Sequence, residues 1–329
     1  MRASKRFFAS AFCSARAPAA SIARASAFVF AVSIASASAF VVAASIACAS
    51  EATTWDAYAR ARPVAAKSIG HTSYVLKVRF EGGLVAAFKP RSTLPLGRVR
   101  YRAEVAAFRL ARALGLSNVP PASGMTLRAP DLAAAFATPE GRREFEAKAV
   151  PDPDGTLPGA LIPWIDDYEV VPLESGALRA KWQAWLMDPA SEPAAPDRTR
   201  AASISTLLAF DYLTANWDRW SGGNVAEHAA TGELLFVDND GAFYDPPPAA
   251  NLASQLERLR HVVRFSRSFV AALRALSDAR LREALAGTAE QPLFSDGVIA
   301  AALARRDTLL GVIDARMARA GEIATLAFE

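Results

Sequence analysis

The feature that most constrains this chain is the stretch from Ser203 to Gly241, where apolar runs lead directly into closely spaced acids and amides. The run from Ser203 to Ala215 is strongly apolar and long enough to predict a buried helix. The run from Leu234 to Val237 is short, which predicts a buried strand, and it ends in Asp-Asn-Asp-Gly. Polar groups that follow two buried elements can converge, so we expect one functional site at this point of the fold.

The polar residues of this stretch have the chemistry of a hard cation site. Asp218 and Asn224 flank the turn Gly222-Gly223, and Asp238 follows the predicted strand. Neighbouring carboxylates in a partly buried site repel each other unless a cation joins them. Oxygen donors from Asp and Asn favour Mg²⁺ or Mn²⁺. A zinc site built from Cys and His is excluded, because the only cysteines, Cys13 and Cys48, lie in or at the edge of the N-terminal leader.

A second group of segments, earlier in the chain, carries a lysine side chain that could face this site. The runs Ser73 to Phe80 and Gly83 to Lys89 are separated by a glycine-rich turn and predict a β-hairpin. The segment Tyr101 to Leu114 has apolar residues at helical spacing and predicts an amphipathic helix that ends at Gly115. Lys89 ends the second strand, and Glu104 lies early in the helix, where a helix packed behind the strand brings the two together.

The remaining segments are predicted more coarsely. Residues 116 to 165 contain short apolar runs and prolines that complete a sheet, and the segment Asp188 to Arg200 is polar and proline-rich, which predicts a surface loop. From Leu252 to the C-terminus we expect mostly helix. Trp217 and Trp220 are expected to pack in the core and not to stack on bases.

The strings FDYLTANWDRWSGGN and LLFVDNDGAFY resemble the catalytic and metal-binding segments of atypical kinases. The four-jointed and secretory-pathway (Golgi casein kinase) family is nearest, with HipA-like and phosphatidylinositol 4-kinase-like enzymes more remote. The resemblance covers 203 to 244 and, more weakly, 70 to 116. It implies an α+β, two-lobed protein-kinase-like fold, with a small antiparallel-sheet N-lobe over 50–165 and a mainly helical C-lobe over 166–329.

The resemblance also implies roles for individual residues. Lys89 would contact the α and β phosphates of ATP and act in catalysis, with Glu104 orienting it. Asp218 would be the catalytic aspartate that accepts the proton of the acceptor hydroxyl or positions that group. Asn224 would be a metal ligand, and Asp238 the principal metal ligand.

Four further assignments follow from the resemblance. Gly70, in the string IGHTS, lies where such kinases cover the phosphates, and Leu161 to Pro163 correspond to the hinge that faces adenine. Arg219 is expected to bond to local carbonyls or carboxylates instead of ATP. Asp240 stands where a small residue is common in the family. It is assigned either as a second metal ligand beside Asp238 or as the true metal ligand in place of Asp238.

The spacing of the catalytic stretch departs from the family pattern. In the family the metal-binding Asn usually follows the catalytic Asp by five positions, whereas Asn224 follows Asp218 by six. Either the Gly222-Gly223 turn bulges or Asn224 has a different role.

These features predict an ATP- and Mg²⁺-dependent phosphotransferase (Mn²⁺ being the alternative metal) that acts on a hydroxyl of a protein or small-molecule acceptor. The alternative is a catalytically inactive pseudokinase that serves as a nucleotide-binding or interaction module. The partners expected are therefore a nucleotide and a phosphate acceptor.

The first 49 residues predict an export leader, with five basic residues, no acid and an uncharged stretch from Ala25 to Ala49. Cleavage after Ala49, lipidation at Cys48 and retention as a membrane anchor all remain open. The chain has a formal net charge of +4, so removing the leader's charges leaves residues 50–329 at −1 and excludes a basic nucleic-acid surface.

The export leader predicts that the protein is periplasmic, extracellular or anchored to a membrane by its N-terminus. ATP is scarce there, so three explanations stay open: the leader is misread, the start codon is placed too early, or the donor comes from the cell envelope.

Overall fold

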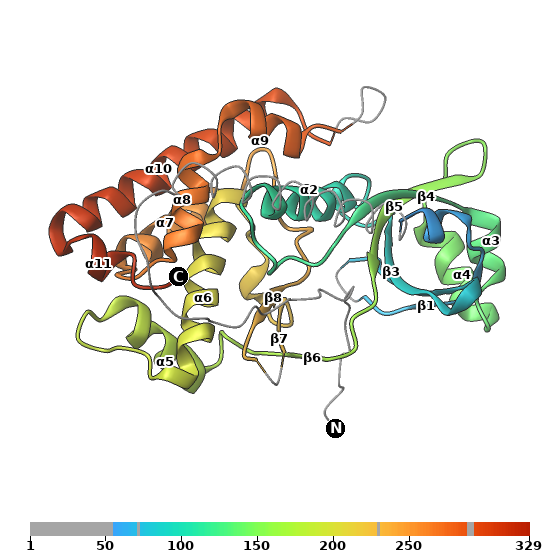
Figure 1. The fold of residues 1–329 in the computed structure, drawn as a ribbon. Coiled ribbons are helices and arrows are strands. Elements are labelled where there is room, and N and C mark those ends of the chain that lie inside the picture. Colours follow the sequence, from blue (N-terminus) through green and yellow to red (C-terminus); the bar gives the residue numbers. More distant parts are fainter. Residues whose placement is uncertain (1–54, 71–72, 229–230, 288–292) are drawn as a thin grey trace, which may run out of the picture.

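The computed structural model describes residues 55–70, 73–228, 231–287 and 293–329 (Figure 1). The predicted leader, residues 1–49, lies outside these residues. Of the helices within the described ranges, none has both the length and the apolar character needed to cross a membrane.

The first half of the described chain is built around one antiparallel sheet of five strands in the order β1-β2-β3-β5-β4. In β2, buried positions alternate with less buried ones, the period-2 pattern of a strand with one face in the core. All but the first residue of β5 are buried. The strands are β1 Pro63–Ser68, β2 Leu76–Phe80, β3 Val85–Pro90, β4 Ser123–Arg128 and β5 Thr156–Pro163.

Three helices accompany this sheet. The helix α2 (Arg100–Ala113) packs along β5 and β4 and reaches α9 (Asp278–Leu285) in the second half of the chain. The helices α3 (Ala129–Ala134) and α4 (Pro139–Lys148) lie at the far end of the sheet, beside β1 (Figure 1). The helix α2 thus connects the sheet to the helical half of the molecule.

The second half is mainly helical, with a small sheet of order β6-β7-β8. Its strands are β6 Tyr168–Val170, β7 Val225–His228 and β8 Leu234–Phe236, and its helices are α5 Gly176–Met187, α6 Ala195–Thr214, α7 Ala249–His261, α8 Arg267–Ala275, α9, α10 Asp296–Ala320 and α11 Glu322–Thr325. The α+β architecture, an antiparallel N-terminal sheet followed by a helical C-terminal region, is confirmed. The predicted boundary between residues 165 and 166 stays a prediction.

The helix α6 is the centre of the helical half and leads into the predicted site. From Ile204 to Thr214 every residue of α6 is buried, so this part of the helix has no solvent-facing stripe. Ala215 then adopts a left-handed conformation (φ 52°), which ends the helix. Arg305 of α10 donates from Nε to the carbonyl of Leu213 at 2.9 Å, so the exit from α6 is held from a second helix.

The predicted hairpin, the helix after it, the buried helix before Asn216, the strand at 234 and the helical C-terminal region are all present. The predicted loop from Asp188 to Arg200 is wrong in its second half, because α6 already begins at Ala195. Pro196 lies in the first turn of α6, where a missing N–H costs no hydrogen bond. The helices α3 and α4 were not predicted.

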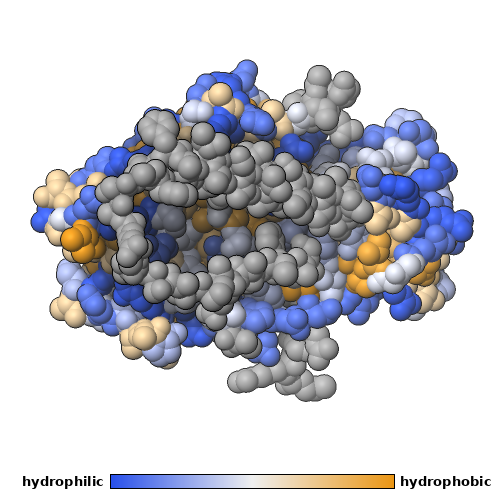
Figure 2. Space-filling model, viewed as in Figure 1, coloured by the Kyte–Doolittle hydropathy of each residue, from blue (hydrophilic) through white to orange (hydrophobic). Residues whose placement is uncertain are grey.

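On the face drawn in Figure 2, the coloured part of the surface is mainly hydrophilic. Large hydrophobic side chains that are exposed in the described ranges are Val64, Leu96, Val99 and Ile323. Scattered apolar residues of this kind are ordinary on a folded protein.

The buried helix α6 gives a stability prediction. Leu207→Ala should lower the free energy of unfolding by about 2–5 kcal/mol, because it opens a cavity at a side chain with 0% exposure. Urea denaturation measures this. Ile323→Ala, at a side chain with 85% exposure, is the control and should change stability by less than about 0.5 kcal/mol. Equal effects of the two substitutions would contradict the placement of α6 in the core.

Candidate functional site

The centre of the candidate site is the ammonium of Lys89, at the end of β3. Its Nζ lies 2.5 Å from Oε1 of Glu104, 2.6 Å from Oδ1 of Asp238 and 3.4 Å from Oδ2 of Asp240. The side chains of Lys89, Glu104 and Asp240 are buried, and that of Asp238 is partly exposed. Three carboxylates from two distant parts of the sequence therefore converge on one amino group.

The backbone of the loop after β8 fixes two of these carboxylates. Asp238 has a left-handed conformation (φ 58°), which Asp adopts more readily than most residues. The chain then turns so that the backbone N–H of Asn239 donates to Oε1 of Glu104 at 2.9 Å. Glu104 is thus bonded to both Lys89 and this loop, and it links the N-terminal sheet to the segment that carries Asp238 and Asp240.

The charges of the cluster shift one another's protonation. Burial disfavours the ammonium of Lys89, but Asp238, Asp240 and Glu104 together raise the pKa of Lys89 well above its ordinary value. Burial also opposes ionisation of Asp238, yet the ammonium of Lys89 holds the pKa of Asp238 below its usual range. Burial raises the pKa of Glu104, and Lys89 only partly offsets this. The cluster therefore favours a charged Lys89 facing an ionised Asp238.

Glu104, Asp238 and Asp240 also form a candidate metal site. Each offers one carboxylate oxygen, and these oxygens lie within 4.8 Å of one another. An all-oxygen donor set suits Mg²⁺ or Mn²⁺. The structure thus groups two of the three predicted metal ligands, Asp238 and Asp240, with Glu104, which was assigned only the role of orienting Lys89.

The third predicted metal ligand, Asn224, is bonded to the turn that precedes it. Its Nδ2 donates to the backbone carbonyl of Asp218 at 2.8 Å and lies 3.3 Å from Oγ of Ser221. Gly222 and Gly223 both have positive φ, at 97° and 84°, so the turn takes a path that favours glycine. The Gly222-Gly223 turn therefore accommodates the extra residue between Asp218 and Asn224. The side chain of Asn224 bonds back to the residue at which this turn begins.

Asp218 is connected to Asp240 through Arg100. Its Oδ2 is 3.9 Å from Nη2 of Arg100, whose Nη2 is 2.9 Å from Oδ1 of Asp240. Burial raises the pKa of Asp218, and the charges of Asp238 and Asp240 add to this while Ser221 and Arg100 oppose it. A carboxylate with a raised pKa is a better proton acceptor than an ordinary one.

Arg219 holds the backbone beneath the site. It is buried, and its Nε donates to the carboxylate of Asp211 at 3.1 Å. Its other nitrogens donate to the carbonyls of Asn224 and Val237 and to Oδ1 of Asn239. The expectation that Arg219 bonds to local carbonyls and a carboxylate is confirmed. A single guanidinium joins the turn at Asn224 to the segment that carries Asp238.

The segment around Gly70 also reaches the cluster. Ser73 donates from Oγ to Oδ2 of Asp240 at 2.5 Å. A Cβ at Gly70 would lie 2.0 Å from the carbonyl oxygen of Ser73, so only glycine fits this approach. His71 and Thr72, the middle of the string IGHTS, lie outside the described residues. Leu161 to Pro163, assigned as the hinge, lie in β5 opposite β3.

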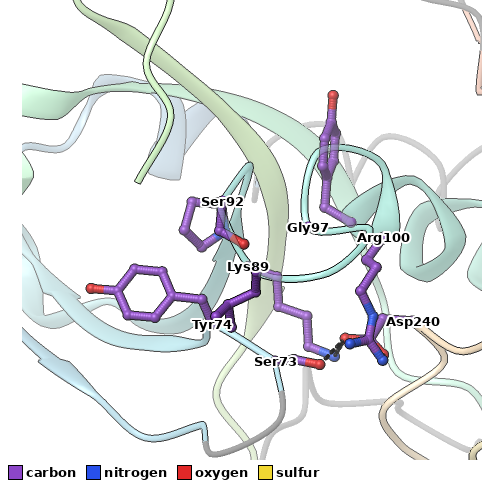
Figure 3. Close-up of a pocket in the computed structure, with 10 residues that line it drawn as sticks. Ser73, Tyr74, Lys89, Ser92, Gly97, Arg100 and Asp240 are labelled. Carbon is purple, nitrogen blue, oxygen red and sulfur yellow. Dashed lines mark hydrogen bonds and ion pairs between the residues drawn. The ribbon is translucent and has the colours of Figure 1, made fainter. Parts of the chain in front are cut away.

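A pocket opens beside these side chains. It is lined by Ser73, Tyr74, Lys89, Pro90, Ser92, Leu94, Gly97, Arg100, Tyr101 and Asp240. Figure 3 shows the side chains of Ser73, Lys89 and Arg100 extending toward Asp240 from separate segments.

Sequence reasoning missed Arg100 and Ser73. Arg100 is the first residue of the helix that carries Glu104, four positions earlier and so on the same helix face. That spacing was a usable signal for Arg100. Ser73 and Asp240 are 167 positions apart, and no sequence pattern links them.

Comparisons with known proteins agree with this fold. No family model and no curated protein matches the chain. Among solved structures, the Golgi casein kinase with Mn and ADP bound superposes with a TM-score of 0.61 at 16% identity, covering 81% of this chain and 76% of that one. Hydra Fam20 with sugar superposes with a TM-score of 0.59 at 18% identity, covering 82% and 90%. The expected likeness to this group of atypical kinases is confirmed at the level of the fold.

Gly241 provides a test of how the two loops fit together. A Cβ at this position would lie 2.8 Å from Cβ of Asp218 and 2.8 Å from Oδ1 of Asn216. Gly241→Ala should therefore push the Asp218 turn away from the Asp238 loop and lower the melting temperature, which calorimetry measures. Gly311→Ala is the control. Outside its own helix backbone, no atom of the described residues lies within 4 Å of the added methyl, so in the interior of α10 the substitution should be neutral or stabilise by up to about 1 kcal/mol. Unchanged stability of Gly241→Ala would contradict the close approach.

Proposed function

We propose that this chain is an ATP- and Mg²⁺-dependent phosphotransferase that acts on a hydroxyl of a protein or small-molecule acceptor. The observation that carries the proposal is the buried Lys89–Glu104 pair at 2.5 Å facing Asp238 and Asp240, with Asp218 beside them. A lysine held by a glutamate in front of metal-binding acids is how kinase-like enzymes hold the phosphates of ATP. The solved Golgi casein kinase with Mn and ADP bound shares this fold, which supports a nucleotide as ligand.

The residues of the cluster divide the work of phosphoryl transfer. Lys89 binds the α and β phosphates, and Glu104 keeps its ammonium directed toward them. The oxygen of the acceptor hydroxyl bonds to the γ-phosphorus while the bond from that phosphorus to the bridging oxygen breaks, and its electron pair stays on ADP. The hydroxyl proton passes to Asp218, whose raised pKa favours its acceptance.

Glu104, Asp238 and Asp240 are the residues that would hold the metal. Bound there, Mg²⁺ would neutralise phosphate charge. The cluster has four carboxylates, counting Asp218, against the cations Lys89 and Arg100. When all are ionised, it carries two excess negative charges and would repel a triphosphate without a divalent cation.

A non-catalytic, nucleotide-binding module is the second candidate. It is favoured by the six-residue spacing from Asp218 to Asn224, which departs from the spacing of five in the family pattern. Binding of Mg-ATP without turnover would support this candidate over the enzyme.

The leader over residues 1–49 is the basis for proposing that the protein works outside the cytoplasm, in the periplasm, the extracellular space or anchored to a membrane by its N-terminus. Protease protection of a tagged full-length chain in intact cells, compared with a chain lacking these residues, tests this placement.

Asp218→Asn tests the proton acceptor. The amide keeps the shape of the side chain but cannot accept the hydroxyl proton, so the rate of γ-phosphate transfer should fall by about 10²–10⁴-fold while the affinity for Mg-ATP changes little. Labelled ATP with candidate acceptors, and with the protein itself, gives the rate. Asp166→Asn, at an exposed carboxylate, is the control and should retain full activity. Full activity of Asp218→Asn would rule out this role.

Asp238→Asn tests the metal site. Asn also tolerates the left-handed backbone at this position, so the fold should be kept. At Mg-ATP concentrations of 100 times its dissociation constant, the wild-type protein should be stabilised by about 2.7 kcal/mol. A tenfold weaker affinity in the variant would reduce this to about 1.4 kcal/mol at the same concentration. Thermal shift with and without Mg²⁺ measures both. Equal metal-dependent stabilisation of the two proteins would contradict the assignment of Asp238.

A further inference from the structure

We propose that Arg100 is an additional catalytic residue, whose guanidinium binds the phosphoryl group as it moves from ATP to the acceptor. This inference rests on the proposed phosphotransfer. Arg100 is the first residue of α2, and its side chain lines the same pocket as Lys89 and Ser73 (Figure 3). No step assigned above uses it.

The position of Arg100 within the cluster gives it this role. The charged groups follow one another in a connected series: Asp238 to Lys89 at 2.6 Å, Lys89 to Asp240 at 3.4 Å, Asp240 to Arg100 at 2.9 Å and Arg100 to Asp218 at 3.9 Å. In this series Arg100 links Asp240, one of the metal-binding acids, to Asp218, the proton acceptor. Arg100 is the cation next to the proton acceptor, where the γ-phosphoryl group has to meet the acceptor hydroxyl.

The guanidinium also has donor capacity that the protein does not use. Its Nε is buried and finds no hydrogen-bond acceptor among the described residues. A guanidinium carries five N–H donors in a planar fork that matches phosphate oxygens. A buried donor without a partner is costly, so a ligand that supplies an acceptor oxygen at this point would be favoured.

Arg100 is the second cation beside Asp240. Asp240 already accepts from Ser73 at 2.5 Å and lies 3.4 Å from the ammonium of Lys89. Both of these contacts are made by Oδ2 of Asp240. Arg100 instead faces Oδ1 at 2.9 Å, and the same Nη2 lies 3.9 Å from Oδ2 of Asp218. Charge that develops on the phosphoryl oxygens during transfer would be stabilised there without reorganisation of the site.

The test compares Arg100→Gln and Arg100→Lys with the wild-type protein and with Arg98→Gln. Arg98 is exposed and lies two positions before Arg100, so its substitution removes the same charge outside the pocket. The readouts are the rate of γ-phosphate transfer and the dissociation constants of Mg-ATP and Mg-ADP.

Arg100→Gln should lower the transfer rate by about 10²–10³-fold, as expected when a preorganised donor to the reacting group is lost. It should weaken Mg-ATP binding and leave Mg-ADP binding unchanged, because only ATP carries the γ-phosphate. Arg100→Lys should not restore the rate, since an ammonium lacks the planar fork. Arg98→Gln should behave as wild type. A merely structural role for Arg100 would alter ATP and ADP binding alike.

Four outcomes would overturn the inference. A transfer rate for Arg100→Gln equal to wild type, equal weakening of ATP and ADP, or full rescue by lysine would each do so while leaving the proposed function intact. Failure of the wild-type protein to transfer phosphate would overturn the proposed function and the inference together.

Discussion

The interaction on which the rest of the site depends is the contact between the ammonium of Lys89 and three carboxylates from two halves of the chain. A buried charge is tolerated only when it is paired and hydrogen-bonded. Lys89 belongs to the N-terminal sheet, whereas Asp238 and Asp240 follow β8 in the helical half. The requirement to compensate these charges therefore fixes how the sheet and the helical half meet, and it does so at the point where we propose that a nucleotide binds.

A second layer of buried polar contacts holds this arrangement in place. Arg219 joins the turn before β7 to the segment after β8 through two backbone carbonyls and Asn239. Gly241 allows the Asp218 turn to pack directly against that segment. Replacing Arg219 or Gly241 would move the acids relative to one another without changing the acids themselves. Some residues of the site therefore position the acidic side chains, and others are proposed to take part in the chemistry.

Much of this could be predicted from the sequence, because the relevant signals are local. Apolar spacing identified the hairpin of β2 and β3, the helix α2 and the buried part of α6, and the order strand, strand, helix placed Glu104 behind Lys89. The contacts of Arg100 and Ser73 with Asp240 were missed, because they join positions more than a hundred residues apart and depend on the tertiary path. The six-residue spacing to Asn224 was noticed, but its resolution needed the positive φ angles of the Gly-Gly turn.

The most direct test of the central claim is to locate the metal and the nucleotide. Anomalous diffraction from crystals grown with Mn²⁺ and a non-hydrolysable ATP analogue gives the position of the ion. We expect a manganese peak about 2 Å from carboxylate oxygens of Asp238 and at least one of Glu104 and Asp240, with the γ-phosphate beside Asp218. A metal bound elsewhere, or a nucleotide that leaves Lys89 and these acids untouched, would contradict it.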